Sequence, residues 1–172
     1  MKKALIIIIV LIVLFMGHSI TVTPSYNTLE IAHAIDEAKT TLKDNQEIVV
    51  FDSKNPFNFY DVFHRIDNIA DQKVYGILTK PDTAGVFPVI IGVAGSVGWG
   101  EHHYGYLERY LDMGFAVLSL HSFKSRSVES TVGEQLSVTV PMVVYDAFMA
   151  LGKLSNNNID TERAGITGWS LG

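Results

Sequence analysis

The stretch that decides the fold is Ala164-Gly165-Ile166-Thr167-Gly168-Trp169-Ser170-Leu171-Gly172, which closes the 172-residue sequence. Residues 164–167 have the composition of a short strand, and a Gly-x-Ser-x-Gly motif follows them directly. A serine in this context lies on a strained strand-to-helix turn, with its hydroxyl above the carboxyl ends of a parallel sheet. Gly168 and Gly172 lack Cβ atoms, so neighbouring backbone can come close at the turn. The stretch therefore predicts a nucleophile elbow with Ser170 at its tip.

The chemistry expected of this elbow is acyl transfer. A serine hydroxyl is a weak nucleophile until an adjacent base accepts its proton, and the tetrahedral intermediate needs two backbone donors. One donor is expected to be the N–H of Leu171, the residue after the nucleophile. The other is expected from the loop Ala94-Gly95-Ser96, as the N–H of Ser96. Trp169 is expected to pack or to shape the acyl pocket.

The segments before the elbow alternate between strands and helices. The apolar runs 87–93 and 115–120 suit strands buried on both faces of a sheet, and helices are expected over 101–113 and 141–154. This alternation predicts an α/β fold with a mostly parallel sheet and helices on both faces. Residues 72–79 alternate as a strand paired antiparallel, with Lys80-Pro81-Asp82 as a turn, so an antiparallel hairpin is expected at the start of the sheet.

The N-terminal half divides into a leader and an extension. A helix is expected over 29–42, a short strand over 47–51 and a loop over 52–59, with Asn55-Pro56 as a turn signal. The predicted organisation is a leader at 1–19, an N-terminal extension at 20–71 and an incomplete α/β domain at 72–172.

The first residues carry a targeting signal. Lys2 and Lys3 precede an unbroken apolar run from Ala4 to Met16, which matches the n- and h-regions of a secretory signal peptide. An uncleaved membrane anchor is the alternative if residues 17–20 extend the run, and a buried core segment is a third interpretation. Both of the first two interpretations predict export to the periplasm or the extracellular space, and membrane contact only if the segment is uncleaved.

Composition excludes several other functions. The chain has 13 Lys+Arg against 18 Asp+Glu and no basic block, so nucleic-acid binding is not expected. The absence of cysteine excludes disulfides, thiolate metal sites and a cysteine nucleophile. No cofactor or metal is expected, and the expected partner is a small-molecule acyl substrate.

Several segments in order resemble the dienelactone hydrolase family of α/β-hydrolases. These are Phe87-Pro88-Val89-Ile90-Ile91, Gly114-Phe115-Ala116-Val117-Leu118, Ser122-Phe123 with Arg126, and Ile159-Asp160-Thr161-Glu162-Arg163 before the elbow. The resemblance covers residues 72–172 and implies the N-terminal part of an α/β-hydrolase fold. The chain departs from the family's patterns at Ala94, Gly95, His121 and Ser170; Ser170 stands in place of a cysteine, which implies serine esterase chemistry.

The superfamily's chain order is nucleophile, acid, histidine, and all six histidines of this chain precede Ser170. The triad acid and histidine are therefore expected beyond residue 172, and residues 20–172 alone are expected to be inactive. Neither His33 nor His64, in the N-terminal extension, is a reasonable base, and His18 lies in the leader.

Three further side chains are candidates for substrate binding. His102, at the expected helix start, and His121, at the end of a strand, are each placed near the rim of the site. For His121 a hydrogen-bonded structural role is the favoured interpretation. Arg126 is suited to an acidic substrate group, although a salt bridge that orders its loop is the favoured interpretation. A metal site at His102-His103 is not expected, because adjacent helical residues diverge by about 100°. Asp146, Asp160 and Arg163 are expected to be structural.

Three functions remain from the sequence. The first is a serine hydrolase of the dienelactone hydrolase type that acts on esters, lactones or related acyl compounds. The second is a non-catalytic binding protein on the same fold. The third is a membrane-anchored peptidase or acyltransferase of the superfamily.

Overall fold

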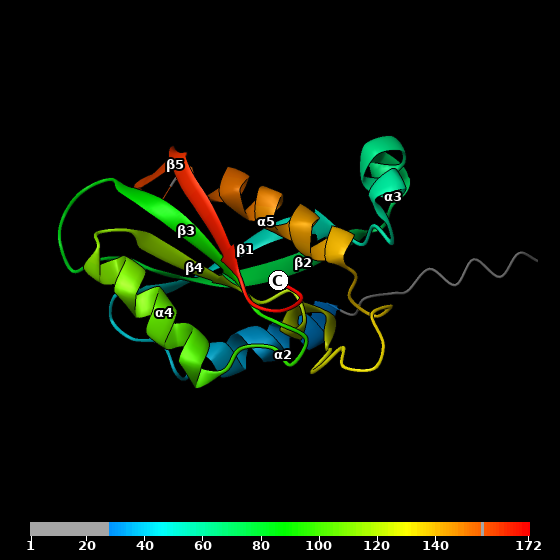
Figure 1. Cartoon of the computed structure of the whole chain (residues 1–172), viewed down its shortest axis with the longest axis horizontal. Helices are drawn as coiled ribbons and strands as arrows, with labels where there is room; N and C mark the ends of the chain where they lie inside the picture. Colours follow the sequence, from blue (N-terminus) through cyan, green and yellow to red (C-terminus); the bar gives the residue numbers. More distant parts are fainter. Residues whose placement is uncertain (1–27, 156) are drawn as a thin grey trace, which may run out of the picture.

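The computed structural model of the protein describes residues 28–155 and 157–172 (Figure 1). Its elements in chain order are α2 (Thr28–Lys39), β1 (Gln46–Lys54), α3 (Phe59–His64), β2 (Asp71–Thr79), β3 (Phe87–Val93), α4 (Glu101–Asp112), β4 (Ala116–Leu120), α5 (Val140–Leu154) and β5 (Ile159–Gly168). Short 3-10 turns cover Ile66–Asn68 and Lys124–Arg126. Within these residues no helix has the length and apolar character needed to cross a bilayer. The predicted leader, residues 1–19, lies outside them.

The strands form one five-stranded sheet in the order β1-β2-β4-β3-β5. β2 pairs antiparallel with both β1 and β4, whereas β3 pairs parallel with β4 and with β5. β2 therefore runs against the other four strands. The α/β class, the parallel strands at the elbow and an antiparallel pair at the start of the sheet are confirmed. The segment Lys80-Pro81-Asp82 does not join paired strands, because β3 pairs with β4 and β5 and not with β2. The hairpin partner of β2 is β1, in register from Gln46 opposite Thr79 to Lys54 opposite Asp71.

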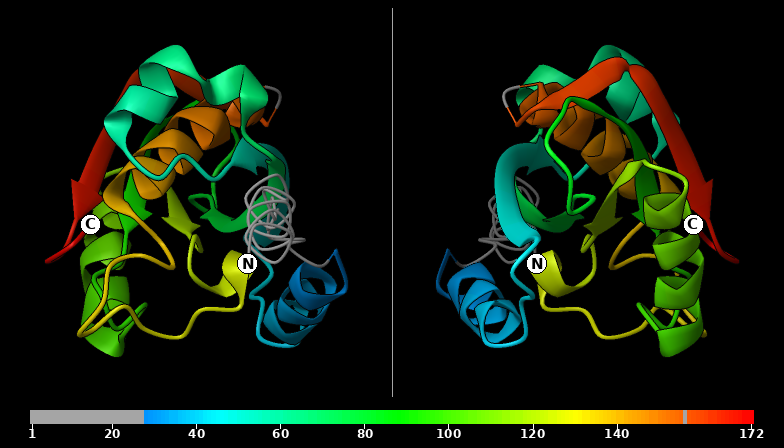
Figure 2. Two further views of the ribbon diagram at one scale, coloured as in Figure 1. Left: turned by 90° about the vertical axis from the view of Figure 1, so that its right-hand side faces the viewer. Right: turned by 90° about the vertical axis from the view of Figure 1, so that its left-hand side faces the viewer.

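Helices cover both faces of the sheet. α4 and α2 lie on one face, and α5 with α3 lies on the other, as the two side views show (Figure 2). The chain passes from β3 through α4 to the neighbouring β4, and then from β4 through α5 back to β5 on the far side of β3. The loops after β3 and β4 thus leave the sheet toward opposite faces, which opens a crevice between the carboxyl ends of these two strands.

The main core lies between the sheet and α5. Thr139 caps the start of α5, since its hydroxyl accepts the N–H of Met142 at 3.4 Å. Pro141 occupies the first turn, where a missing N–H costs nothing. One stripe of the helix is buried against the strands. It consists of Met142, Val143, Asp146, Ala147, Ala150 and Leu154.

Three elements differ from the sequence expectation. β5 begins at Ile159 and not at Ala164, so Asp160 and Arg163 lie within the strand. β1 extends to Lys54, and it belongs to the same sheet as the later strands although it precedes residue 72. The helix α3 was not expected at all. Its N-terminus is a reciprocal cap, in which the Asn58 side chain accepts the Asp61 N–H at 3.0 Å and the Asp61 carboxylate accepts the Asn58 N–H at 3.4 Å. These two hydrogen bonds form a capping box, which begins the helix shortly after Asn55-Pro56, where only a turn was expected.

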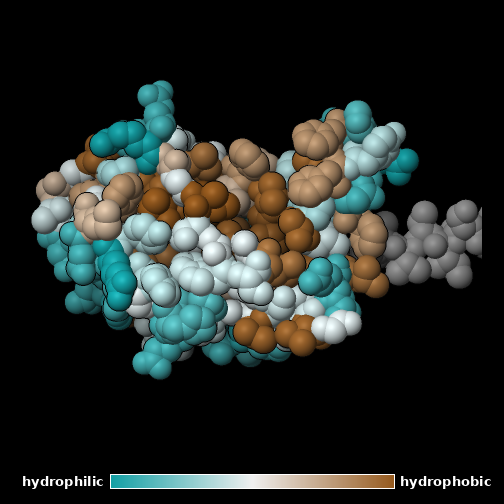
Figure 3. Space-filling model, in the orientation of Figure 1, coloured by the Kyte–Doolittle hydropathy of each residue, from teal (hydrophilic) through white to brown (hydrophobic). Residues whose placement is uncertain are grey.

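β5 is the edge strand of the sheet within the described residues, since its pairing is with β3. Its outward side chains are exposed; Ile166 is 64% exposed, and Phe148 on the neighbouring α5 is 69% exposed. Apolar side chains gather on this side of the molecule, over β5 and α5 (Figure 3). An unpaired apolar strand edge favours association with another strand.

Candidate active site

Ser170 lies on a tight turn immediately after β5. Its backbone has φ of 56°, the left-handed region that residues with a Cβ rarely occupy. The turn is closed by the Gly172 N–H, which donates to the Trp169 carbonyl at 3.0 Å. The Trp169 N–H donates to the Val93 carbonyl at 3.3 Å and ties the turn to the end of β3. The serine is exposed, so the strained turn presents its hydroxyl to solvent at the carboxyl edge of the sheet.

The glycines of the motif are required by close backbone approach. A Cβ at Gly168 would collide with the backbone of Gly172, and a Cβ at Gly172 would lie 2.5 Å from the Val93 carbonyl oxygen. Both contacts are shorter than real Cβ atoms show. The motif therefore has glycine where the turn folds back on itself and on the end of β3.

The loop after β3 lies directly beside the serine. A Cβ at Gly95 would lie 2.9 Å from the Trp169 carbonyl oxygen and 3.1 Å from the Ser170 Cβ. The N–H groups of Ser96 and Leu171 form no hydrogen bond within the described part of the chain. The Ser96 carbonyl does accept one, from the Thr131 N–H at 2.9 Å, which anchors the loop. Two unpaired donors thus belong to segments that meet at Ser170.

An aromatic cluster joins the elbow to the start of α4. The Trp169 ring lies 4.9 Å from His103 and 6.0 Å from both Trp99 and Tyr106, measured between ring centroids. Trp99 is fixed in turn by its indole N–H, which donates to the Leu120 carbonyl at 2.9 Å. The elbow is therefore held from the side by ring packing as well as by its own hydrogen bonds. Trp99 was not predicted as a site residue; its place among glycines, directly after the expected oxyanion loop, was the available signal.

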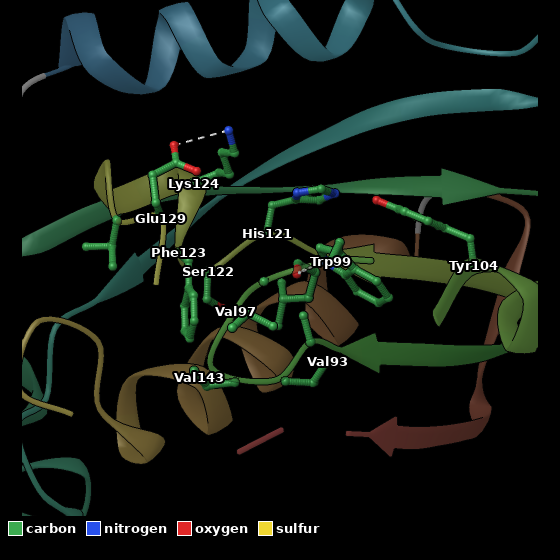
Figure 4. A pocket seen from close by; sticks show the side chains of 14 residues that line it. Val93, Val97, Trp99, Tyr104, His121, Ser122, Phe123, Lys124, Glu129 and Val143 are labelled. Atoms are coloured by element: carbon green, nitrogen blue, oxygen red, sulfur yellow. Dashed lines mark hydrogen bonds and ion pairs between the residues drawn. The ribbon is translucent and has the colours of Figure 1, made fainter. Parts of the chain in front are cut away.

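A cavity of about 360 Å³ opens between the carboxyl ends of β3 and β4 (Figure 4). Its walls come from the loop after β3, the loop after β4 and α5. They include Val93, Ala94, Val97, Trp99, His121, Ser122, Phe123, Val128 and Val143, with Lys124 and Glu129 also contributing. A second hollow, of about 740 Å³, lies between α4 and the loop before β1 and reaches the amino end of β4 at Val117. The first cavity is the one at the edge where open α/β sheets bind ligands.

His121 is placed in the wall of this cavity. Its ring stacks on Tyr75 with 4.8 Å between centroids and an interplanar angle of 9°, and its Nε2 is 3.5 Å from the Ser119 hydroxyl. Burial lowers the pKa of His121 to about 4, and the positive charge of Lys124 acts in the same direction. The imidazole is therefore neutral at physiological pH and presents no charge to the cavity.

The neutral state of His121 makes folding sensitive to acid. Its pKa falls from about 6.5 in the unfolded chain to about 4 in the folded one, so between these values the unfolded state binds more protons. Stability contributed by the neutral ring is complete above pH 6.5 and is lost as the pH falls toward 4. We expect His121→Phe, which keeps the stacked ring, to reduce this acid-induced loss of unfolding free energy by about 3 kcal/mol. Urea unfolding of both proteins from pH 7 to pH 4 measures it, and identical pH profiles would contradict the assignment.

Arg126 cannot bind substrate in this structure, which corrects one of the sequence candidates. Its side chain and that of Asp146 are both 0% exposed. They form a bidentate ion pair with Nη1–Oδ2 and Nη2–Oδ1 distances of 2.7 and 2.9 Å. The guanidinium also donates to the Asn55 side chain at 2.7 Å and to the carbonyls of Ser122 and Lys54 at 3.0 and 3.1 Å. The loop-ordering salt bridge is the role the structure supports for Arg126, because its donors are fully engaged.

The other predicted residues lie away from the cavity. His102 is exposed at the start of α4 with its ring 3.8 Å from that of His103, and it does not line the cavity. His33 and His64 are exposed on α2 and α3. Arg163 donates to Asp160 at 2.6 Å near the start of β5, in keeping with a structural role.

Neither His103 nor His121 is arranged to deprotonate Ser170, because neither ring forms a hydrogen bond with its hydroxyl in the described residues. His103 Nδ1 accepts the Gly100 N–H at 2.9 Å, so in the neutral ring Nε2 carries the proton and is a donor. Burial, together with the nearby His102, lowers the pKa of His103. Within residues 28–155 and 157–172, no imidazole forms a hydrogen bond with the Ser170 hydroxyl.

Comparison with known proteins gives distant structural neighbours. No protein-family model matches the sequence, and no curated protein matches it. A Klebsiella pneumoniae protein assigned as a dienelactone hydrolase is 17% identical, with a TM-score of 0.46 over 72% of this chain and 50% of its own. A dienelactone hydrolase-like promiscuous phosphotriesterase from metagenomic libraries is 17% identical, with a TM-score of 0.49 over 74% and 51%. Esterase Est22 is 14% identical, with a TM-score of 0.46 over 87% and 40%. The chain spans about half the length, or less, of these hydrolases and esterases.

Proposed function

We propose that the protein is a serine hydrolase of the dienelactone hydrolase-like type that acts on ester, lactone or related acyl substrates. The observation that carries the proposal is the left-handed backbone of Ser170, at φ of 56°, on an exposed turn beside two unpaired N–H donors. Strain of this kind persists where the surrounding structure maintains it, and it is concentrated at functional sites. The acidic balance of the chain and its lack of a basic block favour a small-molecule substrate over nucleic acid.

In the proposed reaction the Ser170 hydroxyl attacks the acyl carbon, and the N–H groups of Leu171 and Ser96 stabilise the oxyanion that develops. The leaving group departs, and water then hydrolyses the acyl-serine. We place the histidine that accepts the serine proton, and the acid that orients it, beyond residue 172. Residues 20–172 alone are then inactive. The apolar run after Lys3 further supports action outside the cytoplasm.

The role of the oxyanion loop gives a direct test of this mechanism. Ser96→Pro removes the backbone donor, and we expect kcat for a 4-nitrophenyl ester to fall by about 10²- to 10³-fold in the complete protein. Ser96→Ala is the matched control, because it removes the side chain and keeps the N–H, and its kcat is expected to stay within about threefold of the parent. Circular dichroism of each variant checks that the loop change leaves the fold intact. Equal activity of the two variants would show that Ser96 is not a donor to the oxyanion.

A further inference from the structure

The cavity between β3 and β4 has a chemical character that restricts what can occupy it. Eight of its side chains are aliphatic or aromatic and hydrophobic, namely Val93, Ala94, Val97, Trp99, Leu120, Phe123, Val128 and Val143. They come from three different segments, so the apolar surface surrounds the space (Figure 4). Pockets of this kind bind the apolar part of a ligand, and a few polar groups fix its orientation.

The two charged side chains of the wall lie opposite each other and are partly exposed. Lys124 is 42% exposed and is paired with Glu129, which is 82% exposed, at an Nζ–Oε1 distance of 3.2 Å. His121 is stacked and neutral, and the guanidinium of Arg126 faces away, into its ion pair with Asp146. An anionic group that enters the cavity would lose hydration against the apolar walls and would have to compete with Glu129 for Lys124, which is unfavourable.

One polar group in the wall lacks a partner. The Ser122 hydroxyl is buried and forms no hydrogen bond within the described residues, although its residue is only 5% exposed. The oxygen atom itself has almost no accessible surface, so the wall at Ser122 offers a ligand no exposed hydroxyl. The apolar walls therefore favour a ligand that is neutral and mainly apolar.

The cavity is adjacent to the serine along the backbone. Ala94 lines the cavity, and the next residue, Gly95, packs against Ser170. We infer that the cavity binds the uncharged, mainly apolar acyl part of the substrate and discriminates against substrates that carry a carboxylate there. That the ligand is a substrate rests on the proposed hydrolase function. The charge preference of the cavity rests on its walls alone.

The test uses two unreactive amides of equal chain length, pentanamide and glutaramate, which differ by a terminal methyl or carboxylate. Dissociation constants are measured by NMR titration of the complete protein. We expect pentanamide to bind at least about tenfold more tightly, since the carboxylate of glutaramate would lose hydration against the apolar walls and meet only a lysine that is already paired. Equal binding, or tighter binding of glutaramate, would overturn the inference.

A pair of valine substitutions on one loop shows where the amide binds. Val128 lines the cavity, whereas Val132 is 66% exposed and does not line it. Val128→Phe fills part of the space and is expected to weaken pentanamide binding by about tenfold, while Val132→Phe leaves it within about twofold. An unchanged pentanamide affinity in Val128→Phe would place the ligand elsewhere and overturn the inference.

The inference and the hydrolase proposal fail separately. Preferential binding of pentanamide by a protein whose Ser170 does not react with a fluorophosphonate would refute the hydrolase function and leave the charge preference standing. A reactive Ser170 with tighter binding of glutaramate would refute the charge preference and leave the hydrolase function standing.

Discussion

Replacing Ser170 by alanine is expected to lower kcat/KM for an uncharged 4-nitrophenyl ester by at least about 10⁴-fold in the complete protein. The loss is large because no other described hydroxyl occupies the left-handed turn beside the Ser96 and Leu171 N–H groups. The rate at which 4-nitrophenolate is released, followed by its absorbance, measures the change in kcat/KM. Activity retained by Ser170→Ala would mean that hydrolysis, if present, uses another nucleophile.

The strain at Ser170 predicts an order of stability among its variants that a serine with ordinary backbone geometry would not show. Glycine adopts a φ of 56° freely, so Ser170→Gly is expected to be more stable than Ser170→Ala by about 1 kcal/mol, and both variants are expected to be inactive. Ser155 provides the control, because it lies at the end of α5 with an ordinary φ of −54°. There alanine is expected to be the more stable residue. The same order at both positions in thermal unfolding would argue against a strained elbow.

The second large effect concerns the buried ion pair between Arg126 and Asp146. Arg126→Leu is expected to lower the free energy of unfolding by about 3–5 kcal/mol, because it leaves the Asp146 carboxylate buried without its partner. The Ser53 hydroxyl, 2.5 Å from Asp146 Oδ1, would remain its main described donor. Urea unfolding monitored by circular dichroism measures the change.

Two comparisons separate the cost of an unpaired charge from the loss of the side chain itself. The double variant Arg126→Met, Asp146→Leu removes both charges and is expected to recover most of the lost stability. Lys39→Leu breaks the exposed pair with Asp36 and is expected to change stability by less than about 1 kcal/mol. A double variant as unstable as Arg126→Leu would show that the pair itself, with its hydrogen bonds to Asn55, Ser122 and Lys54, is what stabilises the loop.

The parallel part of the sheet was predictable because its signals are local. The apolar runs that became β3 and β4 have no helical period, and their short length and their flanking glycine or proline favour strands over buried helices. The elbow was predictable from its short motif, since Gly168 is required by its contact with the backbone of Gly172, four residues later. The contact of Gly172 with the end of β3 at Val93 is distant in the sequence, and only the structure shows it. Strand order was not predictable, because β2 precedes β3 in the chain and yet pairs with β1 and β4.

The site beyond the elbow depends on contacts that are distant in the sequence. Arg126 was compatible with substrate or with a salt bridge until the fold placed Asp146, twenty residues later, against it. Trp99 contributes through its contacts with Leu120 and Trp169, on two other segments. α3 was missed because its cap, Asn58 with Asp61, involves an acid that is not the usual Glu or Gln at this position of a capping box.

The account as a whole depends on Ser170 being an activated nucleophile. Treatment of the complete protein with a fluorophosphonate, followed by mass spectrometry of its peptides, tests this most directly. We expect one covalent adduct, on the peptide that contains Ser170, and none after the protein is unfolded before treatment. A protein that stays unmodified at Ser170 under conditions in which a control serine esterase reacts fully would contradict the account.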